Sequence, residues 1–251
     1  MDAYGEDNGF GLKLSVGFPR GTYSQTTSFN LLGVQSSTTS EYEQDATSFG
    51  LTLENRLYVC PQEKWGVAVH ARWIDMNYAA GDMKVKSLST SASYGETSAS
   101  EDLDLSGDYT MDMKNAEIGF LGVGPMFTYY LGNDMAIDVF YNLVPTFMYS
   151  NLKPKEASIA GFDVDLTGDD DIWDWDWDED DDTSSSSDDD SEKNYIGVGI
   201  THNIGAAFRY KFLQAGVEYR LGKMEIAEVD DDADTFDYKT NCFKIFVGFK
   251  F

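Results

Sequence analysis

The sequence predicts an all-β fold: a single eight-stranded antiparallel up-and-down transmembrane β-barrel over residues 1–251. Three observations support this prediction. Apolar residues alternate with polar or small ones in segment after segment, short connections alternate with long ones, and the composition is rich in residues that suit strands and close packing. The chain has 15 Tyr, 16 Phe, 5 Trp and 23 Gly. The sequence contains no run of eighteen apolar residues, so no membrane-spanning helix is expected.

The last segment shows the alternation most clearly. Neighbouring side chains on a strand point to opposite faces, so the alternation gives this strand one strongly apolar face. That face carries Phe243, Ile245, Val247, Phe249 and Phe251, and the other carries Lys244, Phe246, Gly248 and Lys250. Seven further segments read in the same way, at about 10–18, 48–60, 65–78, 115–131, 135–150, 195–212 and 213–226.

The connections between these segments are of two kinds. Tight hairpins are expected at Pro61 to Lys64, around Gly132 to Asp134, and near Lys211 to Leu213. The other four connections are long and rich in Ser, Thr, Gly and Asp, at about 19–47, 79–114, 151–194 and 227–238. Short turns at one end and long loops at the other are typical of outer-membrane barrels.

The less apolar face of the predicted strands indicates which side faces the lumen. It carries many glycines, which a narrow eight-stranded interior needs, and nearly all of the charges of the strands. An Arg or Lys near the middle of the bilayer face would cost roughly 2–4 kcal/mol. We count six bases and three acids on the lumen face and expect a somewhat basic interior. Its predicted charge network consists of Glu54, Arg56, Arg72, Glu218 and Arg220.

The final strand, which follows Cys242 and ends in Phe251, carries apolar residues at alternate positions. It resembles the terminal signature of small bacterial outer-membrane barrels of the OmpA/OmpX type. The resemblance implies a monomer in outer-membrane lipid. An even number of strands puts both termini on the periplasmic side, and the long loops are expected outside. No signal peptide is visible, and Met1 is followed by Asp2, so we expect a mature form with an added methionine.

The charge balance restricts the partners. The net charge is −26, which disfavours nucleic acid and favours divalent cations or a cationic surface partner. Sixteen acids and no base lie between Asp163 and Glu192. This tract is either a solvated acidic segment or a weak Ca²⁺ or Mg²⁺ site, with Asp174, Asp176 and Asp178 as its ligands. No other cofactor is expected.

These patterns predict a porin-like barrel in the cell envelope, a surface protein with a binding, adhesion or envelope-structural role and no enzymatic activity. A lipid-modifying enzyme active at the barrel rim and a narrow channel remain alternatives. The only histidines are His70, expected in the lumen, and His202, expected at a bulge or near the rim. Cys60 and Cys242 are expected to stay unbonded, because the predicted strands place them far apart.

Overall fold

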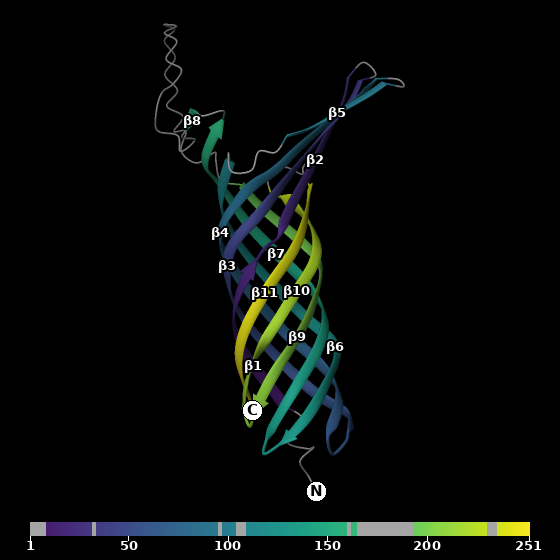
Figure 1. Cartoon of the computed structure of the whole chain (residues 1–251), viewed down its shortest axis with the longest axis vertical. Helices are drawn as coiled ribbons and strands as arrows, with labels where there is room; N and C mark the ends of the chain where they lie inside the picture. The colour runs from purple at the N-terminus through teal and green to yellow at the C-terminus, as the bar shows by residue number, and fades with distance from the viewer. Residues whose placement is uncertain are drawn as a thin grey trace.

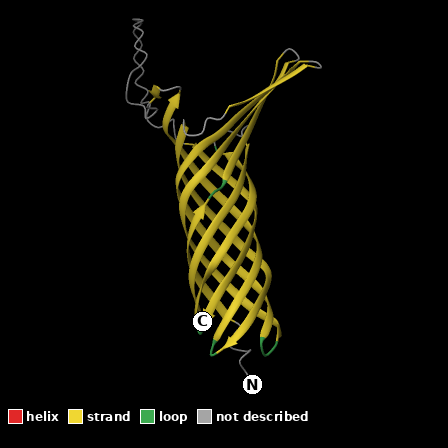
Figure 2. Cartoon of the chain, in the orientation of Figure 1, coloured by secondary structure: helices red, strands yellow, loops and turns green. Residues whose placement is uncertain are grey.

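The computed structural model describes residues 9–31, 34–94, 97–103, 109–159, 162–164, 193–229 and 235–251. Within these ranges every regular element is a β-strand of one antiparallel sheet (Figures 1 and 2), and no helix there is long and apolar enough to cross a membrane. The strands are β1 (Gly9–Pro19), β2 (Thr22–Leu31), β3 (Val34–Pro61), β4 (Trp65–Tyr94), β5 (Thr97–Leu103), β6 (Tyr109–Gly132), β7 (Met135–Ile159), β8 (Phe162–Val164), β9 (Lys193–Tyr210), β10 (Leu213–Glu228) and β11 (Thr235–Lys250).

Eight of these strands close into a ring, which confirms the predicted fold class. β1 pairs with β3, and the pairing continues through β4, β6, β7, β9, β10 and β11. β11 then pairs back to β1, with Gly11 opposite Lys250 and Phe18 opposite Phe243. β1 therefore begins and β11 ends at the same end of the barrel (Figure 1).

β2 continues β1 after a short break at Arg20 and Gly21. The Arg20 amide donates to the Asn241 carbonyl at 2.6 Å, and the Gln44 amide donates to the Gly21 carbonyl at 2.8 Å. A β-carbon at Gly21 would lie 2.7 Å from the Tyr238 ring, so only glycine fits this close approach. Since β2 pairs with both β3 and β11 near its start, the ring stays closed across the break.

The three tight hairpins lie where the sequence predicts them. β3 and β4 are joined through residues 62–64, β6 and β7 through Asn133 and Asp134, and β9 and β10 through Lys211 and Phe212. Asn133 and Asp134 have φ values of 53° and 61°. Two positive φ angles in succession are typical of the type I′ turn, whose twist matches that of the strands it joins.

The outward and inward faces of the barrel differ as the alternation predicts. On β11, Phe243 and Val247 are 41% and 53% exposed, whereas Lys244 and Phe246 are 3% exposed. The outward apolar side chains form a band around the barrel, which we call the apolar band. On β11 it ends at Lys239 and Asp237, where the exposed side chains become charged.

Beyond the apolar band, the chemistry of the two faces is inverted. The outside carries exposed ion pairs, such as Lys223–Asp237 at 2.8 Å and Arg20–Asp45. The inside at this height is an apolar cluster, which we call the upper core. Its buried members are Tyr23, Met83, Met113, Met148, Leu152, Tyr195, Met224, Ile226 and Tyr238. This part of the barrel is therefore built like a water-soluble one.

The long connections differ from the irregular loops that the sequence suggests. Strand structure occupies most of the described residues within 19–47 and 79–114, because β3, β4 and β6 extend beyond the apolar band and β2 and β5 pair with them. Ser and Thr residues pair there with one another across the strands, and β-branched Thr suits a strand without a buried apolar face. Alternation identifies only strands with one apolar face, so it does not predict these extensions.

Part of this extension projects from the barrel while staying continuous with its sheet. We call it the blade: residues 25–31 of β2, 34–40 of β3, 87–94 of β4, and β5. Figure 1 shows it projecting from the end of the barrel that lies opposite the end of β11.

The facing of β11 predicts that Val247→Arg strongly impairs insertion into lipid. The new charge would lie in the apolar band at a cost of roughly 2–4 kcal/mol if it is near mid-depth. Refolding into lipid vesicles, followed by the shift in gel mobility between heated and unheated samples, measures this. Val247→Leu keeps the site apolar and is the control. Equal insertion of the two variants would contradict the assigned facing.

Candidate functional site

The five charged residues predicted for the lumen all lie inside the barrel and are at most 5% exposed. They come from β3, β4 and β10. Direct contacts divide them into three local groups, each of which recruits further partners. Glu54 and Arg56 belong to the first group, Arg72 and Glu218 to the second, and Arg220 to the third.

Glu54 is the centre of the first group. Arg56 lies 3.0 Å from one of its carboxylate oxygens, the other accepts a hydrogen bond from His70 Nε2 at 2.8 Å, and Lys13 forms a further ion pair with it. Arg56 also reaches Asp138 at 2.9 Å, and the Arg209 Nε donates to the same carboxylate at 3.2 Å. These contacts join five ring strands across the lumen, β1, β3, β4, β7 and β9.

The second group is built around Arg72. Its guanidinium binds Glu218 through two nitrogens, one of them at 3.0 Å, and reaches Asp75 at 3.3 Å. Asp75 accepts hydrogen bonds from Thr52 at 3.1 Å and from Asn77 at 3.3 Å. The bidentate geometry is the strongest arrangement that an arginine and a carboxylate can form.

The third group pairs Arg220 with Glu117 at 2.7 Å, and Arg220 Nη2 also donates to Thr146 at 3.4 Å. Glu117 and Asp75 are lumen acids that the alternation rule places on the wrong face. A pair of bulges explains this. On β4, Trp73 is an extra residue relative to β3, since Glu54 lies opposite Arg72 and Leu53 opposite Ile74. On β6, the register with β7 shifts between Gly119 and Val123, so both strands reverse their facing beyond these points.

The two additional acids change the charge of the interior. Among the described residues, six bases (Lys13, Arg56, Arg72, Arg209, Arg220 and Lys244) and five acids (Glu54, Asp75, Glu117, Asp138 and Glu218) are buried. The difference, six minus five, leaves a formal charge of +1. The lumen is therefore nearly balanced, and not as basic as six bases against three acids suggests.

Aromatic side chains and cations fill the lumen around Glu54. The Lys13 ammonium lies 4.3 Å from the Phe140 ring centre and 4.6 Å from the Phe246 ring centre. The two rings come from β7 and β11, and their centres are 6.2 Å apart. His70 packs edge-on against Phe140 at 5.1 Å. Together these groups occupy the bore at this level.

The upper core adds a second closure. Tyr23 and Tyr238 pack with their ring centres 4.4 Å apart, and Tyr23 donates to the Met113 sulfur at 3.4 Å. The Asn115 amide donates to the Tyr23 hydroxyl at 2.7 Å. Tyr23 lies on β2 above the apolar band, and its burial raises the pKa of the phenol above its ordinary value, so the hydroxyl stays protonated.

The second histidine has a different environment. His202 lies on the outward face of β9 and shares a 2.7 Å hydrogen bond with the hydroxyl of Tyr141 on β7. Its strand neighbours Leu143 and Leu221 pair with it in regular register, so the bulge expected there is absent. The position is within the apolar band, flanked by Ile200 and Ile204.

The blade carries a second kind of surface. Residues directly paired across antiparallel strands share a face, so three rungs of the blade lie on one side. They are Thr26–Thr39–Ser89, Ser28–Ser37–Ser91 and Asn30–Gln35–Ser93. We call these nine residues the hydroxyl face. Thr26 and Thr39 hydroxyls are 3.0 Å apart, and those of Ser37 and Ser91 are 2.8 Å apart.

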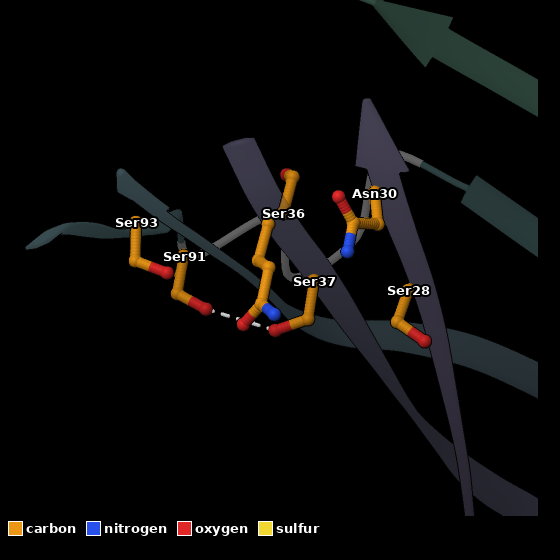
Figure 3. Close-up of a pocket in the computed structure, with 7 residues that line it drawn as sticks. Ser28, Asn30, Ser36, Ser37, Ser91 and Ser93 are labelled. Atoms are coloured by element: carbon orange, nitrogen blue, oxygen red, sulfur yellow. Dashed lines mark hydrogen bonds between the residues drawn. The ribbon is translucent and has the colours of Figure 1, made fainter. Parts of the chain in front are cut away.

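The hydroxyl face is hollowed into an open pocket of about 470 Å³ (Figure 3). Six of its seven lining residues belong to the hydroxyl face, and Ser36 is the seventh. The lining residues are Ser28, Asn30, Gln35, Ser36, Ser37, Ser91 and Ser93. All seven are uncharged hydroxyl or amide side chains, which can both donate and accept hydrogen bonds.

The predicted metal ligands Asp174, Asp176 and Asp178 lie outside the described residues. Within the described part of the chain, no three His, Cys, Asp or Glu side chains are placed to hold a metal ion. Cys60 is exposed, Cys242 is buried, and the two are unbonded, as predicted.

Comparisons with known proteins give only remote likenesses. No family model and no curated protein matches the chain. Among solved structures, the outer membrane protease OmpT from Escherichia coli shares 8% identity at a TM-score of 0.44, over 100% of this chain and 99% of its own. Ail, the attachment invasion locus protein of Yersinia pestis, shares 9% identity at a TM-score of 0.34, over 97% and 99%. Such values assign no function, and the barrel is established by its own strand pairing.

The contacts of Glu54 predict that Glu54→Gln destabilises the barrel by roughly 3–5 kcal/mol, because Lys13, Arg56 and His70 lose the carboxylate that they share inside the lumen. Asp45→Asn removes the exposed Arg20–Asp45 pair and is expected to cost about 1 kcal/mol or less. Urea unfolding in detergent micelles measures both. Similar losses for the two variants would mean that the lumen pairs are no more important than surface ones.

Proposed function

We propose that the protein is an integral barrel of the bacterial outer membrane, with both termini periplasmic, and that the blade is its external binding element, with a role in adhesion. The apolar band supports membrane insertion. Exposed aromatic side chains lie near the ends of ring strands at the hairpin end of the barrel, where they suit a membrane interface: Trp65, Tyr129, Tyr210 and Phe251.

The observation that carries this proposal is the blade itself. It extends the sheet beyond the apolar band with residues that bury no apolar core, so packing within the barrel does not account for it. Along one edge, residues 25–31 of β2 pair with β3, and no other described strand pairs with them. At the other edge β5 pairs with β4 alone. Two open edges and two solvated faces are available to a partner.

The filled interior argues against a channel. Phe140, Phe246 and Lys13 occupy the bore at one level, and the Met and Tyr side chains of the upper core occupy it at another. Eight strands leave an interior that side chains only just fill. A solute would have to displace both sets of side chains to pass.

The positions of the two histidines argue against catalysis at the rim. His70 is fully buried against Glu54 and Phe140, and His202 bonds to Tyr141 within the apolar band. Neither is hydrogen-bonded to a Ser in the described part of the chain. We therefore favour a non-enzymatic role.

Two further parts of the proposal concern partners. Weak binding of Ca²⁺ or Mg²⁺ at Asp174, Asp176 and Asp178 stays a prediction, which the charge density between Asp163 and Glu192 supports. We also expect a monomer, because ring closure leaves the described strands no open edge within the apolar band.

Removing the blade tests the proposal. Ser24 pairs with Glu41 and Leu88 pairs with Leu103, so residues 25–40 and 89–102 can each be replaced by a two-residue Asn-Gly turn without cutting a ring strand within the apolar band. Bacteria displaying this variant are expected to lose the adherence to cultured cells that the whole protein confers on a non-adherent strain. Gel mobility of unheated samples checks that the shortened barrel folds. Unchanged adherence with a folded barrel would contradict the role of the blade.

A further inference from the structure

We infer that the hydroxyl face of the blade binds an uncharged glycan. This inference rests on the proposed function, since it names the class of ligand that the blade would take. Its first support is the chemistry of the pocket, whose lining consists of Ser, Asn and Gln side chains alone. A sugar ring presents hydroxyl groups that both donate and accept hydrogen bonds, and the same holds for this lining.

The second support is the absence of charge. The protein carries −26 overall and a quarter of its residues are charged, yet Gln25 to Ser40 and Ser87 to Tyr94 contain no charged residue. The edge strand β5 carries Glu101 and Asp102, and Asp102 pairs with Ser89, whereas the described lining of the pocket is uncharged. A site for an anionic polymer needs Lys or Arg, which pair with sulfate or phosphate. A site for a cationic partner would use acids, and the described lining of the pocket contains none. The pocket lining therefore suits a ligand without charge.

The third support is the regular spacing of the polar groups. Rows of hydroxyls lie on neighbouring strands, about 4.8 Å apart, and successive rungs are separated by two residues, about 6.8 Å. The rungs Thr26–Thr39–Ser89, Ser28–Ser37–Ser91 and Asn30–Gln35–Ser93 extend this array over three strands. A repeating polymer can contact several rungs at once, which raises its overall affinity above that of a single sugar.

The fourth support is the size and openness of the pocket. About 470 Å³ lies within the range of roughly 300–1,000 Å³ that small-molecule sites occupy. Figure 3 shows Ser28, Asn30, Ser37 and Ser91 around the hollow, contributed by three strands. Since the pocket opens along the face of the sheet, a chain can lie across it without threading.

The test uses the full chain in phospholipid nanodiscs, with two neutral polysaccharides, dextran and mannan, and with heparin as the sulfated comparison. The variant Ser28→Ala, Ser37→Ala and Ser91→Ala removes one rung of the hydroxyl face. The matched control, Thr27→Ala, Thr38→Ala and Thr90→Ala, removes the adjacent rung on the opposite face. Biolayer interferometry measures Kd for each protein at 50 mM and 500 mM NaCl.

We expect at least one neutral polysaccharide to bind, with the same Kd at both salt concentrations because no ion pair is screened. The hydroxyl-face variant should bind it at least tenfold more weakly, and the control should bind it as the unchanged protein does. Failure of both neutral polysaccharides to bind, tighter binding of heparin, or unchanged binding by the hydroxyl-face variant would overturn the inference.

An extended Ser/Thr-rich peptide is included as a third probe, because the open edge of β2 can accept a strand. Binding of this peptide alone would place the site at the edge and overturn the glycan assignment, while leaving the blade as the binding element. Conversely, the adherence assay tests the blade without reference to any ligand. The two proposals can therefore fail separately.

Discussion

The structure depends on the requirement that every backbone N–H and C=O group within the apolar band be hydrogen-bonded, because hydrocarbon offers no alternative partner. The pairing of β1 with β11 meets this requirement by removing both sheet edges. Closure with eight strands then fixes a narrow interior, and the narrow interior determines what the inward positions can hold. Glycines admit the side chains opposite them, and the charged groups must find partners within reach.

The same closure supports the part of the molecule above the apolar band. There the outer face is polar and the inner face is apolar. Lys223 and Asp237 pair outside, while Met224 and Tyr238 are buried inside. The upper core anchors the ends of the ring strands from which the blade continues. It also closes the bore a second time, so the upper core both supports the blade rigidly and closes the lumen.

The sequence predicts the ring well and the extensions poorly, for physical reasons. Alternation identifies a strand when one face is apolar, as on β11, and it places Glu54, Arg56 and Arg72 inward. It fails at Asp75 and Glu117, because two opposed bulges reverse the facing and leave no local sign in residue type. It also misses the blade, whose strands bury no apolar face. Two runs of Ser and Thr residues that face each other across a predicted hairpin, as Thr26 faces Thr39, are the kind of sequence signal that could reveal the blade.

On the single strand β11, the environment of the outer surface changes from lipid to water between Phe243 and Lys239. Spin labels at single cysteines test it most directly, in protein whose Cys60 and Cys242 are replaced by Ser. Labels at Phe243 and Val247 should be relaxed by lipid-soluble oxygen, and labels at Lys239 and Asp237 by a water-soluble nickel complex. A label at Val247 that is relaxed mainly by the nickel complex, or one at Lys239 that is relaxed mainly by oxygen, would contradict this account.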